Sequence, residues 1–334
     1  MKRWIDIGDR SAAAAIRRLA RRYAGKIGMS GTRQDELAIV VTEAVTNILR
    51  YAERGRALVQ MINHPAGDRL ALIFSDKGPG IADIDRMFQD GESSTDSAGL
   101  GLGAIRRLSD SFDIFSSAED GTTIVCTFAA QNTPVSTAID AIGLRVCHPG
   151  EDVCGDDWLL RQTPKSTEII LCDGLGHGHR AAEASAELIA AAKEVSTDPG
   201  STMKHAAERL VGTRGSVAAI VRISEPELYL TYAALGNIAT LCISAQGVKR
   251  LAVRDGRVGG APSRGFEEEL QLSPGDLVIL HSDGLKTLRD THLRPGLLHR
   301  SPLLIAGFLL DRAFRGRDDA SIVVARISPT AQSA

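Results

Sequence analysis

Apolar residues recur at helical spacing in two stretches near the start of the chain, residues 12–26 and 34–51. In the second stretch they fall on one side of a helix, which predicts an amphipathic helix with one buried face. Strand-like alternation follows. The further elements expected in this region are strands at 57–63, 69–75, 111–116 and 122–128 and a helix at 102–109. Few helices on a mostly antiparallel sheet indicate an α/β sandwich.

A polar run at residues 131–137 separates this region from a second one. The second region is dominated by short β-type runs, with helical patterns only at about 180–195 and 203–211, and therefore predicts a β-sandwich flanked by helices. We expect a first domain over residues 1–130, a linker at 131–139 and a second domain over 140–330. The expected strands of the second domain are 144–148, 158–161, 168–172, 216–223, 227–233, 238–244, 277–281 and 321–327.

Composition agrees with a two-domain globular protein. The 334 residues exceed what one hydrophobic core usually serves, and the formal net charge of −2 creates no overall field that would attract nucleic acid. The first six residues meet charge before any apolar segment of a secretion signal can form. The longest apolar run, 303–310, is too short for a membrane helix. We therefore expect a cytoplasmic protein without nucleic-acid or membrane partners.

An acid and an amide share one face of the helix predicted at 34–51. Glu43 and Asn47 are four residues apart and lie beside its apolar stripe. The carbonyl oxygen of Asn47 could ligate a phosphate-bound Mg²⁺, a hard ion that prefers oxygen ligands. Glu43 could then orient or deprotonate an attacking hydroxyl. For this pair alone, an ordinary solvent-facing polar edge explains the pattern as well.

Two glycine-containing segments follow this helix. Asp76 ends an apolar strand and is followed by Gly78 and Gly80, where bare backbone allows a ligand to approach closely. The carboxylate of Asp76 could accept a hydrogen bond from an exocyclic amine, although a tight turn alone explains the glycines equally well. In the second segment the glycines begin a helix, whose free N–H groups and dipole favour phosphate. These glycines are Gly99, Gly101 and Gly103.

Taken in this order, the three elements resemble the GHKL (Bergerat) ATP-binding fold of gyrase-type ATPases, sensor histidine kinases and anti-sigma-factor kinases. The resemblance spans nearly all of residues 1–130 and implies ATP with Mg²⁺ as the cofactor. It implies Glu43 as general base, Asn47 as Mg²⁺ ligand and Asp76 on the adenine amine, with residues 88–98 as a mobile lid. It also implies that Gly78, Gly80 and Thr123 lie beside the base and that Gly99, Gly101 and Gly103 surround the phosphates.

Within that superfamily the sequence favours direct transfer to a protein hydroxyl. A histidine kinase needs a phosphoacceptor histidine upstream, whereas His64 is the one histidine of this region and follows the Glu43 helix. The sequence of residues 89–108 resembles that of RsbT-like switch kinases, which phosphorylate Ser or Thr on STAS-domain proteins. The seven basic side chains from Arg3 to Lys26 could dock a partner or form a solvated helix face.

Aspartates beside glycines recur in the second half of the chain. Asp173 comes directly after an apolar run, and Asp283 comes two residues after another. At the ends of strands, a rigid sheet can hold several carboxylates close to one point. Carboxylate, carbonyl and water oxygens suit Mg²⁺ or Mn²⁺, and no His or Cys cluster indicates zinc. Two such ions would activate water and hold a phosphate. The segments are Gly155-Asp156-Asp157, Asp173-Gly174, Ser282-Asp283-Gly284 and Asp318-Asp319.

This pattern resembles the PPM metal-dependent serine/threonine phosphatases, in particular the sporulation-type branch and its short RsbX-like members, over residues 140–328. The resemblance implies that two Mn²⁺ or Mg²⁺ ions are held by Asp156, Asp173, the Gly174 carbonyl, Asp283 and Asp318, with Asp319 as a substitute for its neighbour. His177 could act on the leaving group or be structural. Lys286 and Thr287 occupy positions that are often acidic in relatives, which puts a third metal in doubt.

The sequence thus predicts a bifunctional regulator. It would phosphorylate Ser or Thr on a STAS-type anti-sigma-factor antagonist or a stressosome-like scaffold and also hydrolyse phosphoserine or phosphothreonine. The alternative is a phosphatase whose N-terminal domain only senses ATP or binds a partner. A gyrase-type ATPase is disfavoured because no transducer domain follows the lid.

Overall fold

The computed structural model describes residues 3–63, 67–84, 98–131, 137–195, 198–260 and 265–328, with only the backbone described at 98–100. The chain forms two compact units, and their boundary is not a single point in the sequence. One unit combines Lys2–Val135 with Leu293–Asp311, and the other contains Ser136–His292 and Arg312–Ala334. A short segment of the second domain expected at 140–330 therefore belongs to the N-terminal unit.

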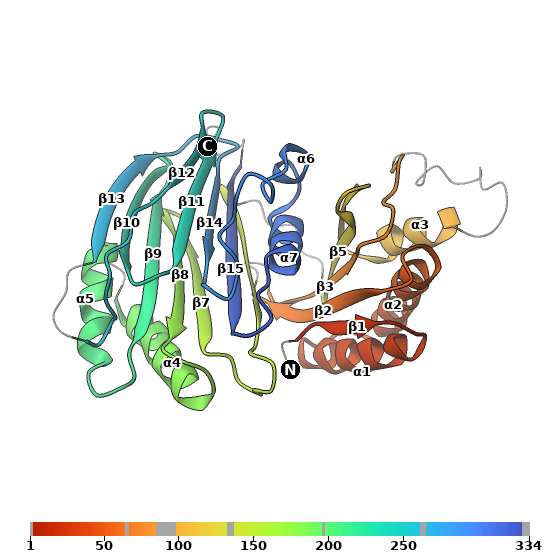
Figure 1. Cartoon of the computed structure of the whole chain (residues 1–334), viewed down its shortest axis with the longest axis horizontal. Coiled ribbons are helices and arrows are strands. Elements are labelled where there is room, and N and C mark those ends of the chain that lie inside the picture. Colours follow the sequence, from red (N-terminus) through yellow and green to blue (C-terminus); the bar gives the residue numbers. More distant parts are fainter. Residues whose placement is uncertain are drawn as a thin grey trace. The chain divides into compact units, whose positions relative to one another are not determined.

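The N-terminal unit is built on one antiparallel five-stranded sheet in the order β1-β2-β3-β5-β4 (Figure 1). Apolar side chains of three helices pack against one face of this sheet and form the core of the unit. The strands are β1 (Ile5–Ile7), β2 (Gly55–Ile62), β3 (Arg69–Asp76), β4 (Ser111–Ser117) and β5 (Gly121–Ala129), and the helices are α1 (Ser11–Lys26), α2 (Gly31–Tyr51) and α3 (Ala98–Leu108).

The two central strands, β3 and β5, are buried along nearly their whole length. Alternate side chains of a strand point to opposite faces, so continuous burial means that both faces are covered. The second face is covered by a helix from the Leu293–Asp311 segment, α7 (Pro302–Arg312), which follows the single-turn α6 (Pro295–Leu298). A Cβ added at Gly307 of α7 would lie 3.0 Å from Ile73 of β3.

The C-terminal unit contains two five-stranded antiparallel sheets, in the orders β13-β10-β9-β8-β7 and β12-β11-β14-β15-β6. Apolar side chains from both sheets form a shared core, and α4 and α5 add a second core against the first sheet. The strands are β6 (Ile139–Val146), β7 (Asp156–Thr163), β8 (Ser166–Gly174), β9 (Ser216–Ser224), β10 (Tyr229–Leu235), β11 (Ala239–Ser244), β12 (Gly247–Arg250), β13 (Phe266–Gln271), β14 (Leu277–His281) and β15 (Ala320–Ile327). The helices are α4 (His179–Glu194) and α5 (Pro199–Arg209).

The predicted α/β sandwich followed by a helix-flanked β-sandwich is confirmed. The sequence patterns missed the short or fully exposed strands β1 and β12, the alternating edge strand β13, and both helices of the 293–311 segment. The strand expected at 144–148 begins earlier, at Ile139, where it pairs with Ile327. Most of the linker predicted at 131–139 lies outside the described residues.

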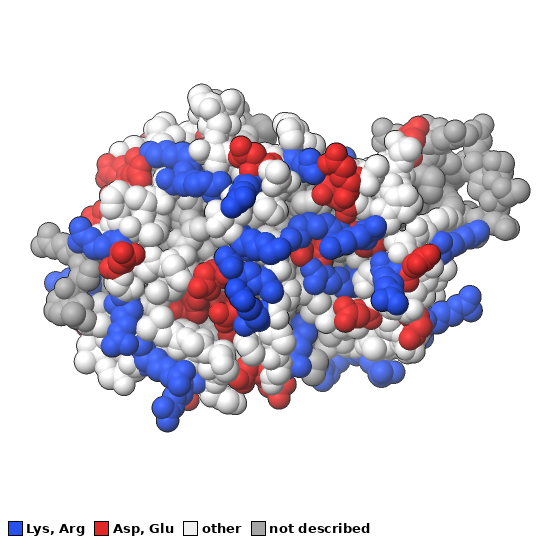
Figure 2. Space-filling view, viewed as in Figure 1, with Lys and Arg blue, Asp and Glu red and all other residues white. Residues whose placement is uncertain are grey.

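The surface offers no single-sign field on the face shown in Figure 2, where acidic and basic side chains are interspersed. This agrees with the near-balance of 39 basic and 41 acidic residues. Within the described part of the chain, no helix combines the length and apolar character needed to cross a membrane.

Candidate nucleotide site and metal centre

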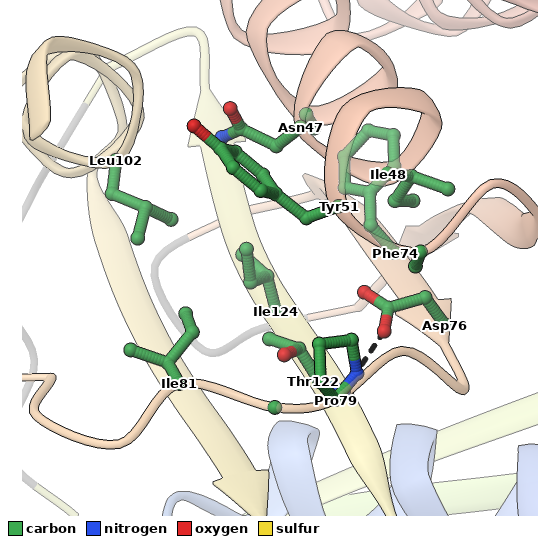
Figure 3. Close-up of a pocket in the computed structure, with 13 residues that line it drawn as sticks. Asn47, Ile48, Tyr51, Phe74, Asp76, Pro79, Ile81, Leu102, Thr122 and Ile124 are labelled. Carbon is green, nitrogen blue, oxygen red and sulfur yellow. Dashed lines mark hydrogen bonds between the residues drawn. The ribbon is translucent and has the colours of Figure 1, made fainter. Parts of the chain in front are cut away.

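A cavity of about 370 Å³ opens between α2, the turn after β3, the start of α3 and β5 (Figure 3). Its wall is largely apolar, and Asn47, Tyr51, Asp76 and Thr122 supply the polar side-chain groups. Few polar groups in an apolar wall are typical of a site that stacks a flat ligand and orients it by hydrogen bonds. The remaining lining residues are Ala44, Ile48, Ala52, Phe74, Pro79, Gly80, Ile81, Leu102 and Ile124.

Asp76 lies at the end of β3 and is fixed by backbone donors. Its Oδ1 accepts the N–H of Gly78 at 2.8 Å and the N–H of Thr122 at 3.2 Å, and Figure 3 draws the second of these bonds. The turn needs its glycines, because a Cβ at Gly78 would lie 2.7 Å from the Ala52 side chain and Gly80 has a φ of 75°. The carboxylate is thus held rigidly at the cavity wall.

Glu43, Asn47 and Gly101 come together where α3 approaches α2. A Cβ at Gly101 would lie 2.9 Å from Oε2 of Glu43 and 3.3 Å from the amide of Asn47. A side chain at this position would therefore fill the space directly over both polar groups. The glycine run does begin a helix, as expected: α3 starts at Ala98, which places Gly99 in its first turn and Gly103 on its second.

The structure corrects one predicted residue of this site. Thr122 lines the cavity, whereas Thr123 points to the opposite face of the sheet and its hydroxyl lies 3.1 Å from that of Ser75. The cause is the period-two alternation of β5, which a one-residue shift inverts. Tyr51 is a cavity residue that the sequence analysis missed. Most of the lid predicted at 88–98 lies outside the described residues.

The aspartates of the second set gather at strand ends, as predicted. Asp156 begins β7 and pairs directly with Asp173 near the end of β8, while Asp283 follows β14 and Asp318 precedes β15. The two strand pairs belong to different sheets of the sandwich. Hydroxyl groups link them, because Ser282 and Ser321 each donate to Oδ2 of the buried Asp156 at 2.6 Å.

The donor set fits a hard divalent cation. Oδ1 of Asp156 is buried and, within the part of the chain that the structure describes, has no hydrogen-bond partner. An orphaned anionic oxygen at full burial is costly unless a cation compensates it. The neighbouring aspartates offer carboxylate oxygens, which suit Mg²⁺ or Mn²⁺. The fold also groups Cys147, Cys154 and Asp319, whose ligand atoms lie within 4.8 Å of one another, a cysteine cluster that the sequence analysis did not expect.

Burial and mutual repulsion act on the same carboxylates. Burial is the largest cause that raises the pKa of Asp156 to about 7 and the pKa of Asp173 to about 10, with neighbouring aspartates adding to both shifts. Burial also raises the pKa of Asp318. Carboxylates held close enough to oppose each other's ionisation form a site with high affinity for positive charge.

Asp318 and Asp319, which the sequence treats as interchangeable, have different surroundings. Both oxygens of Asp319 accept backbone N–H groups, from His148 at 2.7 Å and from Gly155 at 2.9 Å. Asp319 is therefore engaged in holding the loop that precedes Asp156. Asp318 is half-buried and accepts the N–H of Asp319, so its placement suits a ligand better.

Three further predicted residues are placed by contacts around this centre. Oδ2 of Asp283 accepts a hydrogen bond from Asn237 at 2.9 Å. Gly174 packs so tightly against Ala181 of α4 that a Cβ would collide with its backbone. His177 is more than half exposed, hydrogen-bonds Glu151 at 2.8 Å and stacks on His148 with 4.5 Å between ring centroids.

The sequence analysis missed the neutral residues that orient these acids. Ser282 directly precedes Asp283, so its motif contained a signal, but Ser321 and Asn237 stand in ordinary strand and turn sequence. Glu151 and His148 were missed as well, because only the fold brings them to His177.

The comparisons with known proteins assign the N-terminal half. Residues 9–128 match the family model described as histidine kinase-like ATPase domain. The serine/threonine-protein kinase RsbT of Bacillus subtilis (strain 168) is 34% identical over 110 residues, which cover 33% of this chain and 83% of RsbT. The chain belongs, through this half, to the histidine kinase-like ATPase family.

The C-terminal half has its own relatives. Residues 163–328 match the family model of stage II sporulation protein E (SpoIIE). The phosphoserine phosphatase RsbX of Bacillus subtilis (strain 168) is 26% identical over 183 residues, covering 54% of this chain and 90% of RsbX. A crystal structure of RsbX in complex with magnesium matches with a TM-score of 0.53 and 25% identity, covering 57% of this chain and 96% of that one. A histidine kinase-like ATPase domain is thus joined to a domain that is similar to SpoIIE and to the phosphoserine phosphatase RsbX.

Replacing Gly101 by alanine should weaken nucleotide binding by about tenfold or more, since the new methyl group meets Glu43 and Asn47 where phosphates and their metal would lie. Titration with a fluorescent ATP analogue measures the dissociation constant. Gly25→Ala is the matched control, because a Cβ at this helical glycine meets nothing within 4 Å. Equal affinities of the two variants would contradict the assignment.

The metal-free protein should lose stability as pH rises from about 5 to about 9. Asp156 and Asp173 have folded-state pKa values raised to about 7 and about 10, so the folded state retains protons that the unfolded state has already released. Thermal unfolding in chelator measures the trend, and Mn²⁺ should reverse it by compensating the ionised carboxylates. Asp173→Asn should flatten the pH dependence, whereas Asp255→Asn, at an exposed position, should not.

Proposed function

We propose that this protein is a bifunctional switch regulator, an ATP-dependent protein serine/threonine kinase joined to a metal-dependent phosphoserine/phosphothreonine phosphatase. The observation that carries the kinase half is the meeting of Glu43 and Asn47 under Gly101, beside the cavity that holds Asp76. An ATP sensor needs Asp76 and the apolar wall, but it has no need for an acid where the γ-phosphate would lie.

In the kinase half, Asp76 would accept the adenine amine and Asn47 would bind Mg²⁺ through its carbonyl oxygen. Glu43 would take the proton of the incoming Ser or Thr hydroxyl while the oxygen of that hydroxyl forms a bond to the γ-phosphorus. The bond between that phosphorus and the bridging oxygen breaks, and ADP leaves with the electron pair. Such transfer depends mainly on positioning and charge compensation, which the fixed helix face supplies.

In the phosphatase half, Asp156, Asp173, Asp283, Asp318 and the Gly174 carbonyl would hold two Mn²⁺ or Mg²⁺ ions. These ions, when bound, supply activated water and neutralise phosphate charge. The hydroxyls of Ser282 and Ser321 occupy Oδ2 of Asp156, so Oδ1 would be the oxygen that binds the metal. Glu151 would orient His177 to protonate the departing Ser or Thr oxygen.

The proposed substrates are STAS-type anti-sigma-factor antagonists or a stressosome-like scaffold. RsbT and RsbX, the two relatives, carry opposite activities by name, a serine/threonine kinase and a phosphoserine phosphatase. Their counterparts in one chain would add and remove phosphate within one switch, in the cytoplasm.

The kinase half is tested by incubating the protein with labelled Mg-ATP and candidate STAS proteins, in an Asp173→Asn background that prevents removal of the label. Glu43→Ala should lower the labelling rate by at least about a hundredfold while nucleotide binding persists. Glu36→Ala, on the same helix but paired with Arg33, is the control. A partner that is labelled equally by the Glu43→Ala variant would refute the assigned base.

The phosphatase half is tested on phosphoserine peptides with Mn²⁺. Asp173→Asn should reduce kcat by at least about a hundredfold, because it removes a charge from both metal positions. Asp157→Asn is the control. It changes a residue that lies next to Asp156 and pairs with Arg145, and it should retain most activity. Undiminished hydrolysis by the Asp173→Asn protein would overturn the metal assignment.

A further inference from the structure

The segment 293–311 lies in the sequence between two of the proposed metal ligands of the phosphatase, Asp283 and Asp318. It leaves the C-terminal unit after Asp283-Gly284 and returns before Asp318-Asp319. The two stems are joined at their base, where Lys286 donates its N–H to Ala313 at 2.8 Å and Arg315 donates to the carbonyl of Gly284 at 2.9 Å. The stems of this segment are therefore continuous with the loops that carry Asp283 and Asp318.

The middle of the segment is part of the N-terminal unit. Phe308 of α7 meets Phe115 of β4 edge to face, with 5.2 Å between ring centroids. Gly307 lies close against Ile73 and Val125, two residues that are paired across β3 and β5. At the start of α7, the N–H of Ser301 donates to Asp113 at 2.7 Å.

A buried polar contact fixes the other end of α7. Asp311 is 5% exposed, is paired with the guanidinium of Arg56 and accepts a hydrogen bond from Ser75 at 2.9 Å. Arg56, Ser75 and Thr123 are register partners on neighbouring strands, so they form one row across β2, β3 and β5. Removing one member of a buried charge pair leaves the other uncompensated, which makes this contact sensitive to small shifts.

The same two strands carry the nucleotide site on their other face. Asp76 directly follows Ser75, and Thr122 directly precedes Thr123. Asp76 and Thr122 line the cavity and are themselves hydrogen-bonded at 3.2 Å. Asp76 and Thr122, which would hold adenine, are thus the chain neighbours of Ser75 and Thr123, which lie on the Asp311 side of the sheet.

We propose that nucleotide binding at Asp76 activates the phosphatase by stabilising the docked position of α7. The bound base would fix Asp76 and Thr122, and with them the row that holds Asp311, which keeps the Asp283 and Asp318 loops in their metal-binding arrangement. The inference rests on the proposed nucleotide and metal sites, but it does not require that the N-terminal domain transfers phosphate. Because coupling between binding sites is reciprocal, the phosphatase metals should tighten nucleotide binding by a corresponding factor.

The test measures p-nitrophenyl phosphate hydrolysis by the full-length protein at fixed free Mn²⁺, with and without a non-hydrolysable ATP analogue. We expect kcat to rise about fivefold on saturation with the analogue. Asp311→Asn and Ser75→Ala should abolish the rise while the analogue still binds. Asp35→Asn is the matched control, since it makes the same change in an exposed aspartate–arginine pair, and it should respond as the unmodified protein does.

Two outcomes overturn the proposal: an analogue that binds without changing kcat, and a rise that persists in both Asp311→Asn and Ser75→Ala. If Asp311→Asn does not fold, hydrogen exchange across 302–311 decides, because the analogue should slow it in the unmodified protein and not in Ser75→Ala. If basal hydrolysis is absent, the proposed phosphatase activity is contradicted independently of the coupling. The coupling is then judged by whether Mn²⁺ tightens binding of the analogue, in a comparison of the unmodified and Ser75→Ala proteins.

Discussion

The alternation of side chains along β3 and β5 is the constraint on which the N-terminal unit depends. One face of these strands packs against α1, α2 and α3 and ends in Asp76 and Thr122 at the cavity. The other face packs against α7 and ends in Ser75 and Thr123. A register slip of one residue would exchange the two sets, placing Ser75 in the nucleotide cavity and Asp76 in the α7 contact. The site and the docked helix are therefore fixed by the same strand pairing.

Charge repulsion has the corresponding role in the C-terminal unit. Folding brings Asp156 and Asp173 together from paired strands and adds Asp283 and Asp318 from the other sheet. Such an arrangement opposes folding until cations arrive, and the hydroxyls of Ser282 and Ser321 stabilise only one oxygen of Asp156. The remaining oxygen has no hydrogen-bond partner among the described residues. A divalent cation bound among these carboxylates would offset the cost of bringing them together.

The sequence predicted what depends on local pattern and failed where long-range contacts decide. Helix α2, with its stripe and with Glu43 and Asn47 on one face, follows from spacing alone. The strand-end aspartates could be recognised in the sequence because each stands next to a glycine or to a second aspartate. Thr123 was assigned to the wrong face, since one residue of register inverts the orientation and the sequence contains nothing that fixes it. Ser321 and Asn237 carry no motif, so only the folded structure identifies them as supports for the acids.

The apolar run at 303–310 shows the limit of pattern most clearly. A helix with apolar residues on all sides has no amphipathic period, so its sequence predicts neither its type nor its partner. Every residue of α7 from Pro302 to Asp311 is buried, which explains why the run carries no polar face. The one acid in it, Asp311, would be unfavourable at this burial without Arg56 and Ser75. A buried acid of this kind adds specificity to the docked position, since an apolar residue could pack there in several orientations, whereas the carboxylate is satisfied in only one.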